Sequence, residues 1–207
     1  DLLAAHALEV RNVFVVMGDP TSIGDYPDAM DNFDLVPSGL IKLIKQGFNA
    51  GLDHAGSDIG QPTQFFTGCA LNLNTVNIEE ELKNLRRKIR AGADFILTQP
   101  IYNADLVTRF LTEFEKTGTK LPIPLIVGLL PLASARHAAF LQQEVPGIVI
   151  PEEIHDQMRS SGDRGAKTGV SLTAQLAEEI KPFAQGVYLM PAFSRYDHAA
   201  EIIEKIK

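Results

Sequence analysis

The feature that most constrains this chain is a set of apolar runs of β-strand character, each ending in a polar residue. Three such runs and the residues that close them are 13–18 with Asp19, 95–98 with Gln99, and 187–194 with Arg195. Buried parallel strands appear in a sequence as continuous apolar runs. In parallel α/β sheets and barrels, ligand sites form at the carboxyl ends of the strands. The sequence therefore predicts a small-molecule site built from a carboxylate, an amide and a guanidinium.

Strand and helix patterns alternate along the chain, which predicts a parallel α/β architecture. Strands are predicted at 13–18, 64–71, 94–99, 124–130 and 186–192. Helices are predicted near 2–8, 38–46, 78–91, 104–117, 134–143, 151–160, 168–181 and 197–206, with Asn77 and Asn103 as caps of the third and fourth, and loops at 51–62 and 160–165. The pattern is clearest in 78–91, where Ile78, Leu82, Leu85 and Ile89 recur at helical spacing.

Composition narrows the class of partner. The 207 residues are 45% hydrophobic and carry a net charge of −7, which argues against nucleic acid and anionic membranes as partners. No apolar run approaches the roughly 20 residues of a membrane span. The single cysteine, Cys69, forbids an intrachain disulfide and favours a cytoplasmic setting. The five histidines are scattered, so we expect no metal site.

The number of strands limits the possible folds. Five strands do not close an eight-stranded barrel, so the sheet is either open or the later part of a barrel. Residues 2–8 already read as the middle of a helix, and residue 1 is Asp rather than Met. We therefore expect further elements upstream.

Asp19 and Gln99 have the chemistry to hold a heterocycle. A carboxylate accepts two parallel hydrogen bonds from an amidine-like edge, and it stabilises a cation that forms beside it. The Gln99 amide both donates and accepts. The alternatives are local ones, in which Asp19 shapes the Gly-Asp-Pro turn and Gln99 bonds to loop backbone.

Cationic side chains offer contacts to anionic groups. Arg195 is suited to clamping a substrate carboxylate, or alternatively pairs with Asp197 or Glu201. Asn84, Arg87 and Lys88 share one helix face and are suited to gripping a pyrophosphate. The alternative for that face is a solvated surface paired with the acidic residues 79–81.

Several segments, in the right order, resemble the methylenetetrahydrofolate reductase family. They are Val16-Met17-Gly18-Asp19-Pro20 followed by Gly24-Asp25, then residues 91–100 (AGADFILTQP), 128–132 (GLLPL), 144–148 (EVPGI) and 186–195 (GVYLMPAFSR). The segment 57–62 resembles the branch of the family in which a homocysteine methyltransferase domain precedes the reductase domain.

The resemblance implies a fold and a reaction. The family fold is a (β/α)8 TIM barrel that holds FAD, and residues 1–207 resemble a single domain covering roughly strands 4 to 8, with the N-terminal βα units missing. The implied reaction is reduction of 5,10-methylenetetrahydrofolate to 5-methyltetrahydrofolate by NADH or NADPH, ping-pong through the flavin. The implied partners are the folate substrate and either a homo-oligomer or an attached methyltransferase domain.

The resemblance also implies roles for individual residues. Asp19 is the catalytic residue, which binds the pterin edge and stabilises the iminium cation. Gln99, His137 and Arg195 join Asp19 in binding folate, and Arg195 takes its glutamate tail. The implied FAD contacts are Gly18, Asp19, Asn72, Glu81, Asn84, Arg87 and Lys88. The family's general acid is a glutamate on its first strand, which lies outside this sequence.

Two other functions are compatible with the residues. One is a barrel lyase or methyltransferase that works without flavin. The other is a catalytically silent barrel fragment, stable through contacts with other chains, because unpaired strand edges invite association. Affinity for FAD separates the reductase from both.

Overall fold

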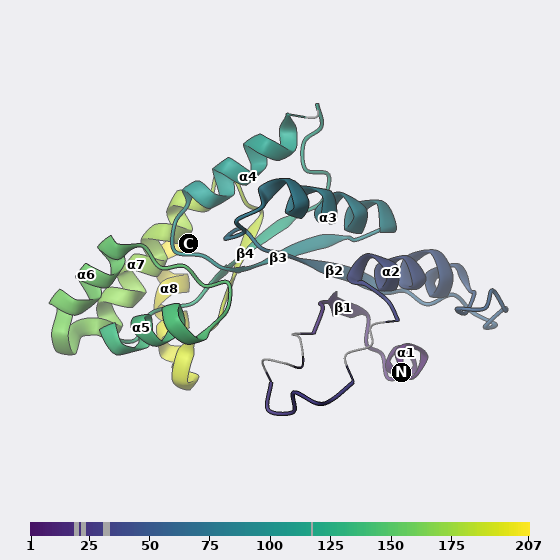
Figure 1. Cartoon of the computed structure of the whole chain (residues 1–207), viewed down its shortest axis with the longest axis horizontal. Coiled ribbons are helices and arrows are strands. Elements are labelled where there is room, and N and C mark those ends of the chain that lie inside the picture. The colour runs from purple at the N-terminus through teal and green to yellow at the C-terminus, as the bar shows by residue number, and fades with distance from the viewer. Residues whose placement is uncertain (19–20, 22–23, 31–33, 117) are drawn as a thin grey trace. The chain divides into compact units, whose positions relative to one another are not determined.

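The computed structural model describes every residue except 19–20, 22–23, 31–33 and 117. Within the described residues the strands are β1 Asn12–Val15, β2 Phe66–Leu71, β3 Phe95–Pro100, β4 Leu125–Leu129 and β5 Gly186–Leu189. The α-helices are α1 Leu2–Ala7, α2 Pro37–Lys42, α3 Ile78–Ala91, α4 Asp105–Glu115, α5 Ala135–Glu144, α6 Glu152–Ser161, α7 Gly165–Ile180 and α8 Tyr196–Ile206 (Figure 1).

These strands form one sheet in the order β1-β2-β3-β4-β5. β1 pairs with β2 in parallel, from Asn12 opposite Phe66 to Val15 opposite Cys69. β4 pairs with β5 in parallel as well, and this register places Gly128 opposite Tyr188. The parallel α/β architecture predicted from the alternation of apolar patterns is confirmed.

Several predicted boundaries were wrong, including the following three. β1 ends at Val15 rather than residue 18, so Gly18 follows the strand in irregular backbone. β5 ends at Leu189 rather than residue 192, because Pro191 has no backbone N–H and Phe193 and Ser194 adopt positive φ angles of 55° and 57°. The loop predicted at 160–165 is the end of α6, a 3-10 turn at Gly162–Arg164 and the first residue of α7.

The helix caps show how local chemistry sets helix starts. Asn77 caps α3 as predicted, because its Oδ1 accepts the backbone N–H of Glu80 at 3.1 Å. Asn103 is not the cap of α4: that position is Ala104, and Asn103 instead accepts the N–H of Asp105 at 2.8 Å in a local turn. Ser134 caps α5 by accepting the N–H of His137 at 3.1 Å.

The chain divides into two compact units, which are described separately. The first unit is Asp1–Ala70 with Leu82–Ile96, and the second is Leu71–Glu81 with Leu97–Lys207. Among the helices of the described residues, none combines the length and apolar character needed to cross a membrane.

In the first unit, a partly buried ion pair fixes the start of β2. Lys45 Nζ donates to both oxygens of Asp94 at 2.9 and 2.8 Å and to the carbonyl oxygen of Phe65 at 3.3 Å. Asp94 in turn accepts the backbone N–H of Thr67 at 2.6 Å. Because only about a fifth of each charged side chain is exposed (21% and 22%), solvent screens the pair weakly. The network holds the chain just before β3 against the beginning of β2.

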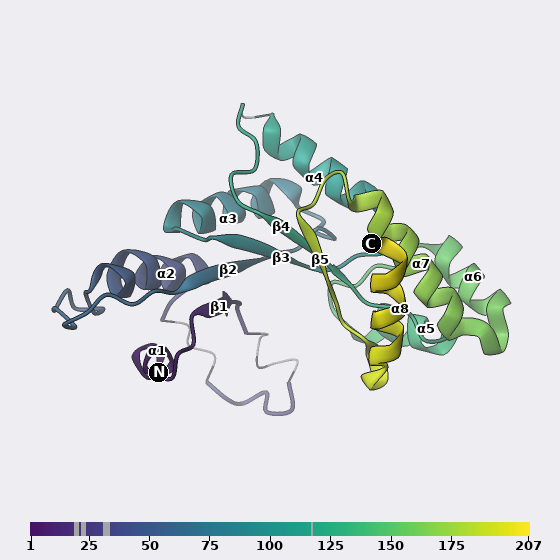
Figure 2. The same ribbon diagram turned by 180° about the vertical axis from the view of Figure 1, so that it is seen from behind.

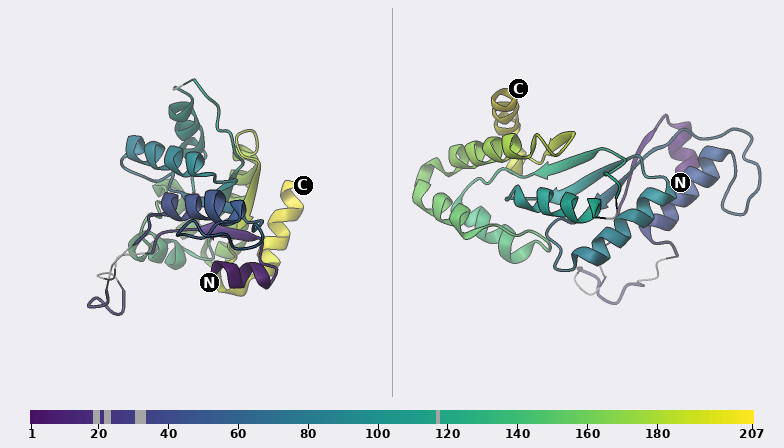
Figure 3. Two further views of the ribbon diagram at one scale, coloured as in Figure 1. Left: turned by 90° about the vertical axis from the view of Figure 1, so that its right-hand side faces the viewer. Right: turned by 90° about the horizontal axis from the view of Figure 1, so that it is seen from above.

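In the second unit, helices α5 to α8 pack in succession. α5 contacts α6, α6 contacts α7, and α7 contacts α8 (Figure 2 and Figure 3). One apolar core of this unit is made of Tyr102, Leu132, Ala138, Leu141, Ile148, Ile150 and Met158. A second core joins α7 to α8 through Val170, Ala174 and Ile202.

Tyr188 joins β5 to β3 across β4. Its hydroxyl donates to the carbonyl oxygen of Thr98 at 2.6 Å. The residue between them is Gly128, where a Cβ atom would lie 2.8 Å from Tyr188 Oη and 3.0 Å from Thr98 O. Gly128 also donates its N–H to Thr98 Oγ1 at 3.0 Å. The absence of a side chain at residue 128 therefore lets the tyrosine cross β4 and fix the end of β3.

Helix α7 approaches the segment after β4 closely at Gly169, which yields a stability prediction. A Cβ at this position would lie 1.8 Å from the carbonyl oxygen of Leu132. We expect Gly169→Ala to lower the free energy of unfolding by about 1–3 kcal/mol, because the helix must move away from that backbone. Urea unfolding of the full-length protein measures the change.

The control is Gly186→Ala in β5, because a Cβ at Gly186 meets no atom within 4 Å, so this change should alter the free energy of unfolding by no more than about 0.5 kcal/mol. In a helix interior without a close contact, Gly→Ala stabilises by about 1 kcal/mol, so a loss of stability at Gly169 reports the contact with Leu132. A Gly169→Ala protein as stable as the wild type, or more stable, contradicts the close approach.

Candidate functional site

The second unit places three predicted site residues after or at the ends of successive strands. Gln99 is the penultimate residue of β3, His137 lies in the first turn of α5 after β4, and Arg195 follows β5. Gln99 and Arg195 are exposed and His137 is half-buried. The three side chains therefore belong to the carboxyl-terminal side of the strands, where α/β proteins build ligand sites.

Gln99 lies against the loop between α5 and α6. Its Oε1 would be 2.4 Å from a Cβ placed on Gly147, and its Cδ 3.3 Å. Gly147 has a φ of 81°, which side-chain-bearing residues rarely adopt. A glycine is needed here both for the backbone conformation and for the amide that lies against it.

The sequence reasoning missed Asn74. Its Nδ2 donates to the carbonyl oxygen of Gly147 at 2.9 Å and to that of Pro100 at 3.4 Å. Pro100 follows Gln99 in the chain, and Gly147 lies against the Gln99 amide. Asn74 therefore bonds to two residues that are in direct contact with this glutamine. The one available signal was its position in the short polar segment between β2 and α3.

His137 is held as a neutral imidazole with a defined tautomer. Its Nδ1 accepts the backbone N–H of Ala133 at 3.2 Å, so the ring proton of the neutral form is on Nε2. The Phe193 ring meets the imidazole edge to face at 5.1 Å. Burial lowers the pKa of His137, because it penalises the charged form. His137 can therefore present an Nε2–H donor.

Arg195 pairs with Asp197, one of the two alternatives that the sequence left open. Its Nε donates to Asp197 Oδ1 at 2.9 Å and an Nη to Oδ2 at 2.6 Å. The hydrogen bonds from Arg195 lower the pKa of Asp197 to about 2. The pair is exposed, so a ligand carboxylate can compete for the guanidinium at low cost.

The backbone before Arg195 is strained. Phe193 and Ser194 both have positive φ, a conformation that costs side-chain-bearing residues about 1 kcal/mol or more each. The turn directs the chain from β5 into α8 and brings Phe193 to His137. Such strain is found where a site requires a particular backbone path.

The predicted phosphate-binding face lies on the part of α3 in the first unit. An Arg87 Nη donates to Asn84 Oδ1, as expected from their spacing of three residues. Lys88 Nζ donates to the carbonyl oxygen of Ala70, at the end of β2, at 2.8 Å. A guanidinium, an ammonium and an amide together fit a pyrophosphate, because all three supply N–H donors. This donor set is compatible with the phosphates of FAD.

In the second unit, Asn72 and Glu81 are joined to each other. Glu81 Oε1 accepts the backbone N–H of Asn72 at 3.1 Å. A carboxylate retains further lone pairs for ligand hydroxyls, so Glu81 is compatible with a ribose. Among the other predicted FAD residues, Gly18 is exposed, and Asp19 lies outside the described residues.

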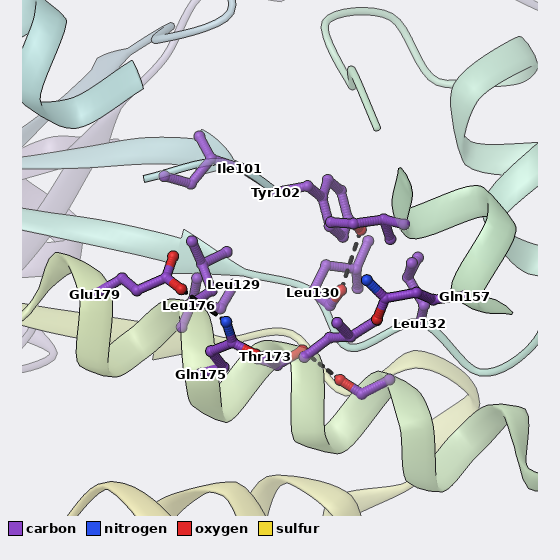
Figure 4. Close-up of a pocket in the computed structure, with 13 residues that line it drawn as sticks. Ile101, Tyr102, Leu129, Leu130, Leu132, Gln157, Thr173, Gln175, Leu176 and Glu179 are labelled. Atoms are coloured by element: carbon purple, nitrogen blue, oxygen red, sulfur yellow. Dashed lines mark hydrogen bonds between the residues drawn. The ribbon is translucent and has the colours of Figure 1, made fainter. Parts of the chain in front are cut away.

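A cavity of about 160 Å³ lies elsewhere in the second unit (Figure 4). It is lined by α6, α7, the end of β4 and the residues after β3, and by none of the predicted site residues. Its buried hydroxyls already have partners: Tyr102 donates to Leu130 O at 3.0 Å and Thr173 to Gly169 O at 2.8 Å. The exposed polar side chains of Gln157, Gln175 and Glu179 also line the cavity, so it is partly open to solvent.

Comparison with known proteins identifies the family. The sequence model of "Methylenetetrahydrofolate reductase" matches residues 1–207, the whole chain. This chain belongs to the methylenetetrahydrofolate reductase family. The family fold is a TIM barrel, and the five parallel strands found here are part of that fold.

Individual relatives are distant and longer. Methylenetetrahydrofolate reductase 2 of Saccharomyces cerevisiae is 26% identical over 181 residues, which cover 82% of this chain and 27% of that protein. Methylenetetrahydrofolate reductase 1 of Schizosaccharomyces pombe is 25% identical, over 86% of this chain and 28% of that protein. Methylenetetrahydrofolate reductase (NADH) 1 of Zea mays is 25% identical, over 84% and 30%. The chain thus spans less than a third of the length of these relatives.

A solved structure that shares the fold is that of an uncharacterized protein from Clostridium thermocellum that binds two copies of 5-methyl-5,6,7,8-tetrahydrofolic acid. The TM-score is 0.54 at 19% identity, over 69% of this chain and 52% of that one.

The pKa of His137 yields a pH prediction. Since the folded pKa lies below the ordinary value of about 6.5, the unfolded state binds more protons between the two values. The His137 contribution to stability is therefore present above about pH 6.5 and is lost as pH falls toward the folded pKa. Asparagine keeps an acceptor near the position of Nδ1 but does not titrate. We therefore expect the His137→Asn protein to lose less stability than the wild type as the pH falls below about 6.5.

Thermal unfolding of the full-length protein measures this difference. The pH is varied from about 7.5 to about 5.5, which is about 1 pH unit on either side of the ordinary histidine pKa. His54→Asn is the control, because the His54 side chain is exposed in the loop at residues 51–62. Identical pH slopes for the wild type and His137→Asn contradict the assignment.

Proposed function

We propose that this chain supplies the folate-binding side chains and part of the FAD-binding side chains of a reductase. The reaction is the FAD-dependent reduction of 5,10-methylenetetrahydrofolate to 5-methyltetrahydrofolate, with NADH or NADPH as hydride donor in a ping-pong sequence. The observation that carries the proposal is the placement of Gln99, His137 and Arg195 at three successive strand ends, in a chain that the family model matches throughout.

Each of these side chains has a chemical task in the proposed site. Gln99 presents a donor and an acceptor to the pterin edge, and His137 presents its Nε2–H. Arg195 binds the glutamate tail of the folate in place of Asp197. The Clostridium thermocellum protein of similar fold, which binds 5-methyltetrahydrofolic acid, is consistent with a folate ligand.

FAD, when bound, supplies the hydride-transfer chemistry between the nicotinamide and the folate. In our proposal Asn84, Arg87 and Lys88 hold its phosphates, and Asn72 and Glu81 lie at its ribose. Gly18 and Asp19 border the flavin, with Asp19 next to the reacting folate carbon. A fixed carboxylate there stabilises the cation that forms on the methylene group.

We further propose that residues 1–207 are the C-terminal part of the barrel, strands 4 to 8. In this proposal the family's general acid, a glutamate on its first strand, is not one of residues 1–207. A second copy of the chain or an attached methyltransferase domain is the proposed partner. The setting is cytoplasmic, a proposal supported by the presence of a single cysteine, Cys69, in the sequence.

The function is tested on the full-length protein. We expect bound flavin to appear in its absorption spectrum, and methylenetetrahydrofolate to drive anaerobic oxidation of NADH or NADPH with 5-methyltetrahydrofolate as product. A protein that lacks flavin, and does not take it up when FAD is added, supports the flavin-independent barrel enzyme instead. A flavoprotein that leaves the folate unchanged also contradicts the proposed reaction.

The phosphate-binding face predicts a selective loss of FAD. Arg87→Gln should weaken FAD binding about 10- to 100-fold, the effect of losing one charge-assisted hydrogen bond. Quenching of flavin fluorescence measures the affinity. Arg86→Gln is the control, because Arg86 is two positions from both Asn84 and Lys88 and therefore lies on the opposite side of the same helix. Equal losses in both variants indicate a general charge effect and contradict the site.

Asp19→Asn tests the proposed catalytic residue. The change keeps the size of the side chain but removes the charge that stabilises the cation. We expect FAD binding to be retained and folate reduction to slow by about 100-fold, as for the loss of one electrostatic stabiliser. Rapid-reaction kinetics of the folate step measure the rate. Folate turnover at the wild-type rate rules out this role.

A further inference from the structure

The Gln99 carboxamide projects from an exposed position but stands on a backbone that is bonded on both sides. On the N-terminal side, the carbonyl oxygen of Thr98 accepts the Tyr188 hydroxyl at 2.6 Å. The Thr98 hydroxyl donates to the carbonyl oxygen of Gln99 at 2.7 Å and accepts the N–H of Gly128. These bonds fix the peptide planes on which the Gln99 side chain depends.

Tyr188 is suited to act as a permanent donor. It is half-buried, and burial raises the pKa of its phenol, so the hydroxyl keeps its proton in the physiological range. Its ring lies over Gly128, so the path from β5 to β3 is rigid. Removing the hydroxyl alone, as in Tyr188→Phe, leaves the ring in place and frees the carbonyl oxygen of Thr98.

On the C-terminal side, Asn74 makes the corresponding contacts. Its amide donates to Pro100 O and to Gly147 O, and the Gln99 amide lies against Gly147. Asn74 is itself held, because its N–H donates to Asn72 Oδ1 at 2.9 Å. Asn72 in turn donates its N–H to Glu81. A chain of hydrogen bonds therefore runs from Glu81 to the surroundings of Gln99.

We infer that Asn74 and Tyr188 are positioning residues, which hold the Gln99 carboxamide in one orientation toward the bound ligand without touching that ligand themselves. The role for folate rests on the proposed function, whereas the ordering of the side chain does not. The link through Asn72 to Glu81 further connects the proposed ribose contact to the proposed folate contact.

The first measurement concerns order alone. In the full-length protein, the side-chain amide signals of Gln99 are assigned by NMR through their loss in Gln99→Ala. We expect {1H}-15N relaxation to show a rigid amide in the wild type and a mobile one in Tyr188→Phe and in Asn74→Ala. A Gln99 amide as rigid in both variants as in the wild type overturns the inference, whatever the ligand is.

The second measurement is a double-mutant cycle on 5-methyltetrahydrofolate affinity. Each single variant should bind about 3- to 10-fold more weakly, the effect of one hydrogen bond. In the Gln99→Ala background the same changes should have less than about a 2-fold effect, because a residue acting through Gln99 has nothing left to position. A loss of affinity of about 3- to 10-fold that is equal in the two backgrounds overturns the inference.

Two controls separate positioning from general stability. Tyr102→Phe removes another phenol-to-carbonyl bond of the same unit, and Asn77→Ala removes the cap of α3. We expect both to lower the melting temperature but to keep the folate affinity and the rigidity of the Gln99 amide. If order is lost as expected but neither Gln99→Ala nor the positioning variants change folate binding, the positioning role stands and the proposed function is overturned.

Discussion

The hydrogen bond from Tyr188 to the carbonyl oxygen of Thr98 is the contact on which the candidate site depends. It crosses an entire strand, and it can do so because the intervening residue is Gly128. Backbone groups at the end of a strand lose their regular partners, and leaving them unsatisfied when buried costs about 1–3 kcal/mol each. Here the Tyr188 phenol donates to the carbonyl oxygen of Thr98, and the Thr98 hydroxyl donates to the carbonyl oxygen of Gln99 and accepts the N–H of Gly128.

Because these hydrogen bonds fix the backbone at the end of β3, the Gln99 side chain can be ordered while it stays exposed. The Gln99 amide and the Arg195–Asp197 pair are exposed, while the hydrogen bonds that fix the backbone beside Gln99 are buried or partly buried. His137 shows the same division, because its Nδ1 is used by the backbone of Ala133 and its Nε2–H remains for a ligand. Function on α/β folds commonly resides in such strand-end groups on a fixed scaffold.

Features set by interactions between residues close together in the sequence were predicted, and features set by contacts between distant residues were not. The bounds of α3 were predicted correctly, because four apolar residues at helical spacing and the Asn77 cap are all local signals. The strand ends pointed to Gln99 and Arg195 in the same way. Asn74 and Tyr188 were missed because their bonds join residues 73 and 90 positions apart. The positive φ angles of Phe193 and Ser194, which follow β5, were also not predicted, because neither residue is a glycine.

The most direct test is a crystal structure of the full-length protein with 5-methyltetrahydrofolate. We expect the ligand's heterocycle within hydrogen-bonding distance of the Gln99 amide, with its carboxylates at the Arg195 guanidinium in place of Asp197. A folate bound in the cavity between α7 and the end of β4, lined by Tyr102 and Glu179, would contradict it. So would a ligand held by groups that leave Gln99, His137 and Arg195 without contact.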